Sequence, residues 1–208
     1  RFFRECDQII PCRGRLSHAS ELRKITCPVF FRLLYSSGIR TTEARFLTRS
    51  GVDFAQGVLD IQKSKGYDQH YVALHPSMTE LLERYDRAAD RLSPGRTYFF
   101  ESPGGHPYSR TWVSYNFSLL WEKANGKKGG TVAYDLRHNY ATANINGWKD
   151  DVFEFNDRLH YLARSMGHRC MESTLYYYSV VPGLAGIIQE KTEENFNSIV
   201  PEVAYEEE

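Results

Sequence analysis

Four short segments of the sequence carry side chains suited to phosphate chemistry. In chain order they are Gly38-Ile39-Arg40-Thr41-Thr42-Glu43, the stretch with Lys63 and Lys65, Tyr134-Asp135-Leu136-Arg137-His138, and Met166-Gly167-His168 followed by Tyr176-Tyr177-Tyr178. An arginine side chain stays charged and can hold two phosphate oxygens at once. Lysine and histidine can move protons, and a tyrosine phenol can attack phosphorus once a neighbour assists its deprotonation. Together these residue types could cut or join a phosphodiester.

Each of these residues taken singly has a simpler interpretation. Arg40 alone would be a surface arginine at a helix end, and Arg137 alone an ion-pair partner of Asp135 or of a neighbouring acid. A hairpin lysine is usually solvated, and His168 alone would pack or cap a turn. The three tyrosines alone would be aromatic residues at the end of a helix. Only the order and context of the segments favour a common site.

In this order, with a tyrosine nine residues after the Gly-His pair, the segments resemble the catalytic domain of the tyrosine recombinases, the integrases and Xer-like enzymes that cut and rejoin DNA. The likeness runs from about residue 20 to residue 180 and is closest to integrases of mobile elements. It implies that Arg40 and Arg137 clamp the phosphate and that His168 assists. Tyr177 becomes the nucleophile, and the family's hairpin lysine maps to Lys65, with Lys63 as the rival.

The resemblance also implies a reaction. Attack by Tyr177 joins the DNA to the protein through a 3′-phosphotyrosine and expels a 5′-hydroxyl, whose oxygen needs a proton donor such as Lys65. Because the phosphotyrosine is an ester of similar energy to the bond that is broken, the hydroxyl of another strand can reverse the step without ATP. We therefore expect no metal, no nucleotide cofactor and no small-molecule substrate.

Tyr134 departs from the family pattern, which usually has His or Lys at this position. A neutral phenol is a poor general base where an imidazole would be a competent one. The residue that assists Tyr177 thus stays open between His168 and the group at position 134. His138 lies about 100° around a helix from Arg137, so we expect it to pack or to bond to backbone rather than to replace the missing base.

The elements that must position these residues can be predicted from apolar spacing. A helix is expected over residues 20–35, ended by Gly38, and Thr41 or Thr42 is expected to cap a short helix, which leaves Arg40 at its entrance. Residues 58–61 and 70–74 predict a β-hairpin whose turn presents the lysines. Further helices are predicted after Pro76, after Ser109, after residues 134–138 and over residues 160–165. The predicted fold class is α+β, mainly α-helical, with one small antiparallel sheet.

The charge of the chain is unevenly distributed. The formal net charge is zero, but the last twenty residues contain seven Glu and one Lys, so the rest of the chain is basic. A basic body can meet the DNA backbone. The acidic end could equally be a solvated terminus or a contact with another subunit. The candidates for backbone contact are Arg45, Arg49, Arg110, Lys127, Lys128 and Arg169.

Composition and cysteine spacing indicate the class of the protein and the compartment in which we expect it. Hydrophobic residues make up 41% and charged residues 25%, which is typical of a globular domain, and the apolar runs are too short for a membrane helix. Cys6, Cys12, Cys27 and Cys170 match no common zinc or disulfide spacing, so we expect reduced thiols in a cytoplasm. A metal site between His160 and His168 is also not expected.

The domain organisation and partners follow from the resemblance. Residues 1–208 are read as one catalytic domain, and a preceding DNA-clamping domain is expected because the chain opens at Arg1 without a start methionine. The partners implied are double-stranded DNA and further copies of the chain, four on two DNA sites, linked by a C-terminal segment at about residues 182–208. Without DNA we expect a monomer or a weak oligomer. Two alternatives stay open: a DNA-binding regulator without turnover, and a type IB topoisomerase-like activity.

Overall fold

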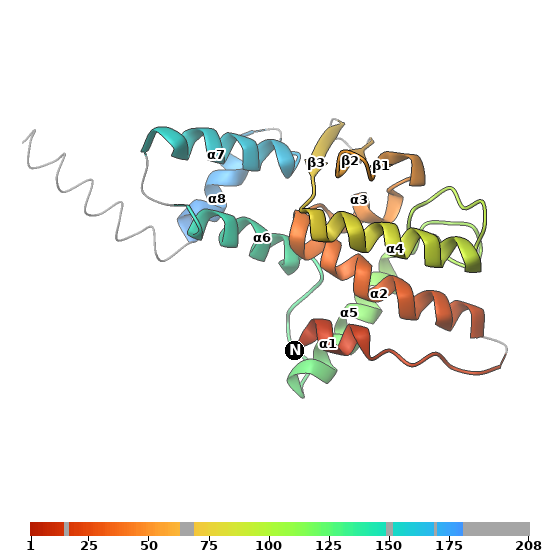
Figure 1. Ribbon diagram of the computed structural model, residues 1–208. Helices are drawn as coiled ribbons and strands as arrows, with labels where there is room; N and C mark the ends of the chain where they lie inside the picture. Colours follow the sequence, from red (N-terminus) through yellow and green to blue (C-terminus); the bar gives the residue numbers. More distant parts are fainter. Residues whose placement is uncertain (15–16, 63–68, 149–151, 169, 181–208) are drawn as a thin grey trace, which may run out of the picture.

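The computed structural model describes residues 1–14, 17–62, 69–148, 152–168 and 170–180. The strands are β1 (Val52–Asp53), β2 (Val58–Ile61) and β3 (His70–Ala73), and a 3-10 turn spans Arg49–Gly51. The helices, shown in Figure 1, are α1 (Phe2–Asp7), α2 (Ser17–Ser37), α3 (Thr41–Phe46), α4 (Pro76–Leu92), α5 (Arg110–Asn125), α6 (Asp135–Asn146), α7 (Val152–Ser165) and α8 (Glu172–Val180). The predicted fold class is confirmed, since helices dominate and the small sheet is antiparallel.

The long helix α2 is central because its apolar residues recur every three or four positions. Phe30, Phe31 and Leu33 are fully buried, and α2 contacts α4, α6 and α1. The helix ends before Gly38, whose positive φ of 65° is a conformation that glycine adopts without strain. The ring of Tyr140 on α6 lies so close that a Cβ at Gly38 would collide with it. The end of α2 therefore meets α6 through a residue that has no side chain.

The sheet has the order β1-β2-β3, with both strand pairs antiparallel. Leu59 of β2 pairs with Val72 of β3, and both side chains are fully buried. The predicted hairpin is thus confirmed. Strand β1 was not predicted, because two residues are too few to show the alternation that identifies a strand. Helix α1, only six residues long, was missed for the same reason.

The buried apolar residues form two clusters. The larger cluster contains residues from each of the first five helices and from the sheet. The smaller one joins the last three helices and consists of Ala141, Ile145, Leu162, Met166 and Tyr177. Figure 1 shows α6, α7 and α8 together at one end of the molecule, away from α1 and α5. No described helix is both long and apolar enough to cross a membrane.

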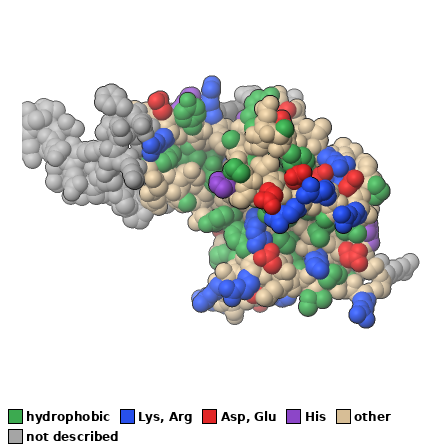
Figure 2. All heavy atoms as spheres, viewed as in Figure 1, with side chains coloured by type: hydrophobic (Ala, Val, Ile, Leu, Met, Phe, Trp, Pro, Cys, Tyr) green, Lys and Arg blue, Asp and Glu red, His purple; other side chains and the backbone are tan. Residues whose placement is uncertain are grey.

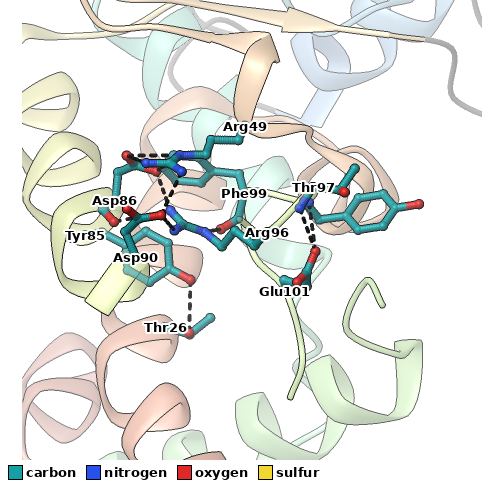
Figure 3. A network of polar contacts seen from close by, with 10 residues as sticks. Thr26, Arg49, Tyr85, Asp86, Asp90, Arg96, Thr97, Phe99 and Glu101 are labelled. Atoms are coloured by element: carbon teal, nitrogen blue, oxygen red, sulfur yellow. Dashed lines mark hydrogen bonds and ion pairs between the residues drawn. The ribbon is translucent and has the colours of Figure 1, made fainter. Parts of the chain in front are cut away.

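A network of ion pairs ties α4 to the segment that follows it. Lys and Arg side chains mix with Asp and Glu over α4 in Figure 2. In Figure 3, Arg96 pairs with Asp86, and Arg49 reaches Asp86 at 2.9 Å and Asp90 at 2.7 Å. The side chain of Arg96 is only 1% exposed, whereas that of Arg49 is 36% exposed. Arg49 is therefore part of the scaffold in this structure.

Candidate active site

Arg137 is a buried arginine that connects three separate segments of the chain. It lies in the first turn of α6 and is 1% exposed. Its Nη1 donates to the carbonyl of Gly38 at 2.5 Å, and its Nη2 donates to the carbonyl of Met166 at 2.7 Å and to Nε2 of His168 at 2.9 Å. Burial and the nearby Arg40 guanidinium lower the pKa of Arg137. Arg137 on α6 thus binds both the end of α2 and the loop after α7.

Arg40 lies beside Arg137 at the entrance of α3. The structure makes Arg40 itself the N-cap residue, so the expectation that Thr41 or Thr42 caps this helix is wrong. The cap is provided by the buried Glu43, whose carboxylate accepts from the backbone N–H of Arg40 at 2.7 Å and from its Nη1 at 2.6 Å. Nη2 of Arg40 donates to the carbonyl of Gly167 at 3.0 Å. The loop at Met166 and Gly167 therefore accepts hydrogen bonds from both Arg137 and Arg40.

The hydrogen bonds of His168 determine its tautomer. A guanidinium has donors only, so Nε2 of His168 must accept from Arg137. Nδ1 then carries the hydrogen and donates to Oγ1 of the buried Thr174 at 2.7 Å. Burial, together with the positive charges of Arg137 and Arg40, lowers the pKa of His168 to about 4. His168 is consequently neutral near pH 7, with both ring nitrogens engaged.

Tyr177 is the tyrosine that faces this group of residues. It is 4% exposed, and its ring lies parallel to that of His168, with 6.1 Å between the ring centres. Tyr176 is 60% exposed, and the side chain of Tyr178 lies outside the described residues. Burial raises the pKa of Tyr177, as does the nearby Tyr134, while the charge and hydrogen bond of Arg137 lower it. Adjacent positions on a helix point in different directions, which explains why one tyrosine is enclosed and its neighbour is not.

Tyr134 and His138 lie next to Tyr177. Their rings are one helical turn apart on α6 and contact each other edge to face, with 4.9 Å between the ring centres. The ring of His138 is also 5.3 Å from that of Tyr177. We expected His138 to pack outside the chemistry, and it does pack, but one of its partners is the candidate nucleophile. The angle from Arg137 did not indicate this, because it does not tell which distant segment packs against His138.

Three of the predicted residues, Lys63, Lys65 and Arg169, lie outside the described residues. Strand β3, which follows the lysine segment, begins at His70 beside the site. A Cβ at Gly167, whose φ is 62°, would collide with the His70 ring. The structure therefore brings Arg40, Arg137, His168 and Tyr177 together, and places the start of β3 against the same loop.

Two neighbouring cavities extend from this site along α3 and α5. Their volumes are about 460 Å³ and 280 Å³, and both are lined by Thr42, Arg45 and Arg110. Arg40 and Tyr134 also line the smaller one. Burial and the charge of Arg110 lower the pKa of Arg45, which reflects two cations close together. Lys127 and Lys128 are exposed between α5 and α6, whereas Arg49 is engaged by Asp86 and Asp90.

Comparison with known proteins shows to which family the chain belongs. A family model described as "Phage integrase family" matches residues 14–182. The chain belongs to the phage integrase family. The match covers every element from α2 to α8, and so includes the segments that supply Arg40, Arg137, His168 and Tyr177.

Individual proteins resemble the chain in sequence or in fold. A protein of Sinorhizobium fredii that carries an integrase/recombinase name, y4rE, is 32% identical over 176 residues, which cover 83% of this chain and 57% of y4rE. The chain thus spans little more than half of that relative. In fold it is similar to a XerH site-specific recombinase bound to a palindromic difH substrate (TM-score 0.66, 17% identity, 92% and 50% of the two chains). It is also similar to the catalytic domain of bacteriophage HP1 integrase (TM-score 0.56, 17% identity, 98% and 94%).

Proposed function

We propose that the chain is the catalytic part of a tyrosine-type site-specific recombinase. It would cleave duplex DNA of a mobile element through a 3′-phosphotyrosine and rejoin it to a new strand. The observation that carries this proposal is the convergence of Arg40, Arg137, His168 and Tyr177, which come from four segments and meet around the Gly167 loop. Each of these side chains belongs to a family motif in the sequence.

The two arginines would bind the phosphate that is attacked. Charge accumulates on the non-bridging oxygens as phosphorus becomes five-coordinate, and guanidiniums fixed in advance stabilise it without reorganisation. Arg40 and Arg137 are held by Glu43 and by main-chain carbonyls, so their positions do not depend on DNA. His168 holds Arg137 from the side of α8. Substrate binding would therefore meet a preformed clamp.

Tyr177 would attack the phosphorus, forming the bond from its phenolic oxygen to phosphorus as the bond to the 5′-oxygen breaks. The leaving oxygen takes up a proton, which we assign to Lys65, with Lys63 as the alternative. A 5′-hydroxyl from another strand then attacks the phosphotyrosine and regenerates Tyr177. No metal or nucleotide takes part in this scheme.

Duplex DNA would cover the cavities along α3 and α5. Arg45 and Arg110 line both cavities and are the first candidates for neighbouring phosphates, and Lys127, Lys128 and Arg169 are further ones. We leave Arg49 out of this surface, because its guanidinium is engaged by two carboxylates. The Tn1549 transposon integrase, which is similar in fold and whose structure is a complex with transposon right end DNA, supports this choice of ligand.

The remaining parts of the assembly belong to the same proposal. A DNA-clamping domain would accompany this chain, in keeping with the 57% of y4rE that it spans. Four protomers would assemble on two DNA sites through the segment at about residues 182–208, which lies outside the described residues. Free of DNA, the chain would be a monomer or a weak oligomer. The reaction would take place in the cytoplasm.

A covalent trapping experiment tests the proposal. The complete protein is incubated with a pool of duplexes that carry random sites and a nick, so that cleavage releases a short 5′-hydroxyl fragment and traps the adduct. Adducts that survive detergent are recovered and sequenced. We expect wild type and Tyr176→Phe to form the adduct and Tyr177→Phe to form none. An equal yield from Tyr177→Phe would overturn the proposal, and DNA binding without any adduct would indicate a regulator. Relaxation of supercoiled DNA without strand exchange would indicate a topoisomerase.

A further inference from the structure

The proton of Tyr177 cannot go to His168 in the arrangement observed. Nε2 of His168 accepts from Arg137, and Nδ1 already carries a hydrogen that it donates to Thr174. Neither nitrogen has a lone pair directed at the Tyr177 hydroxyl. A phenol nevertheless needs a proton acceptor before it attacks phosphorus near neutral pH. Another group close to Tyr177 must fill this role.

Tyr134 lies close to Tyr177, and burial together with the nearby Tyr134 raises the pKa of Tyr177. The oxygen of a phenol can accept a hydrogen bond from the Tyr177 hydroxyl. A neutral phenol does not keep a second proton, however, so Tyr134 can only pass one on. Its own hydroxyl proton needs a destination.

His138 is the group that can receive that proton. Its ring contacts Tyr134 at 4.9 Å and Tyr177 at 5.3 Å between ring centres, so it borders both phenols. Within the described part of the chain its imidazole has no hydrogen-bond partner, in contrast to His168. Imidazole is also the side chain best suited to gaining and losing a proton near neutral pH.

We propose that His138 is the proton acceptor for Tyr177, with the hydroxyl of Tyr134 as the relay between them. This inference rests on the proposed function. As the Tyr177 oxygen bonds to phosphorus, its proton passes to the oxygen of Tyr134, and the proton of Tyr134 passes to a nitrogen of His138. The phosphorus–5′-oxygen bond breaks, and that oxygen takes its proton from the lysine. During rejoining, the imidazolium returns its proton along the same path to Tyr177.

The charges around the rings link proton transfer to DNA binding. The titratable and charged groups here are Tyr134 and Arg137 from α6, Tyr177 from α8, His168 before it, and Arg40 and Glu43 from α3. A bound phosphate brings negative charge beside the two arginines, and negative charge stabilises a positive charge that forms close by during the reaction.

Chemical rescue tests the inference in the complete protein with a nicked duplex recovered in the trapping experiment. We expect His138→Ala to slow adduct formation by about 10²-fold or more, with DNA affinity unchanged, and free imidazole to restore much of the rate. His160→Ala, which changes an exposed histidine on α7, is the matched control and should behave as wild type.

Two further measurements distinguish a proton acceptor at His138 from a proton donor and from a purely structural residue. Tyr134→Phe keeps the ring but breaks the relay, so it should slow the reaction about as much as His138→Ala. A substrate with sulfur in place of the 5′-bridging oxygen needs no proton donor, and His138→Ala should stay slow on it. Three results would each overturn the inference. The first is a wild-type rate of His138→Ala on the sulfur substrate, and the second is an unchanged rate of adduct formation in His138→Ala on the ordinary duplex. The third is a slower rate in His138→Ala that free imidazole does not restore. If wild type forms no adduct with any duplex, the proposed function fails instead.

Discussion

The guanidinium of Arg137 donates a hydrogen bond of 2.9 Å to Nε2 of His168, across 31 positions of the sequence. This bond sets the tautomer of His168 and keeps it neutral, and it removes His168 from the list of proton acceptors. It also ties α6 to the loop that leads into α8, and thereby to Tyr177. One side-chain contact thus orients the proposed phosphate clamp and the proposed nucleophile together.

Replacing Arg137 by lysine should damage both the fold and the reaction. A lysine ammonium cannot satisfy the carbonyls of Gly38 and Met166 and the His168 ring at once, and each buried acceptor left unsatisfied costs about 1–3 kcal/mol. The loss of a preorganised donor should slow cleavage by at least about 100-fold. Urea unfolding and the adduct rate measure the two effects. Arg87→Lys, on the exposed face of α4, is the control, and equal behaviour of the two variants would contradict the arrangement described.

The stability of the protein should depend on pH through His168. Its pKa is near 6.5 in an unfolded chain and is lowered to about 4 here, so between these values the unfolded state binds more protons. The free energy of unfolding should therefore fall as pH is lowered from about 6.5 to about 4. Denaturation of wild type and His168→Asn over this range measures the contribution. The same change of unfolding free energy with pH in both proteins would show that His168 does not cause this pH dependence.

Thr174 should act as a positioning residue for His168. Thr174→Val keeps the shape of the side chain but removes the acceptor for the Nδ1 hydrogen. We expect cleavage to slow about tenfold and the Nδ1 proton of His168 to lose its hydrogen-bonded chemical shift and to exchange faster with water in NMR spectra, while Arg137 keeps the tautomer unchanged. Thr174→Ser retains a hydroxyl and should restore both the rate and the Nδ1 proton signal. An unchanged Nδ1 proton signal in Thr174→Val would contradict this role.

The ion pairs of α4 should differ in their effect on stability according to burial. Arg96→Ala removes an almost fully buried partner of Asp86 and should cost about 3 kcal/mol or more. Arg49 is more exposed, so Arg49→Ala should cost about 1 kcal/mol or less. Chemical denaturation of both variants provides the test. The reverse order would mean that Arg49, not Arg96, holds the network together.

Arg110 should contribute to DNA affinity through phosphate contact alone. If Arg110 binds one phosphate, Arg110→Ala weakens binding to all duplexes alike and lowers the slope of log affinity against log salt by about 1. Titrations with labelled duplex at several salt concentrations measure the slope. Arg87→Ala, whose side chain pairs with Glu83 on α4, should leave it unchanged. A change confined to one DNA sequence would instead indicate base contact.

Most of the secondary structure could be predicted from local patterns. The apolar spacing over residues 20–35 lies within α2, and the runs 58–61 and 70–74 correspond to β2 and β3. These patterns persist because helices and strands repeat every 3.6 and every 2 residues. The short elements α1 and β1 lack enough residues for either period. The N-cap of α3 was missed because Glu43 reaches back to Arg40, which residue preferences at the cap position did not indicate.

The sequence by itself determined the family, and it indicated Arg40, Arg137, His168 and Tyr177 as the candidate site, since motif spacing is a property of the chain. It could not reveal that both nitrogens of His168 are occupied, that Arg49 is paired with Asp86 and Asp90, or that His138 borders Tyr177. Only the tertiary structure decided these points. The physical reason is that local periodicity depends on backbone geometry, whereas a side chain's partner depends on which distant segments the packed core brings within hydrogen-bonding distance.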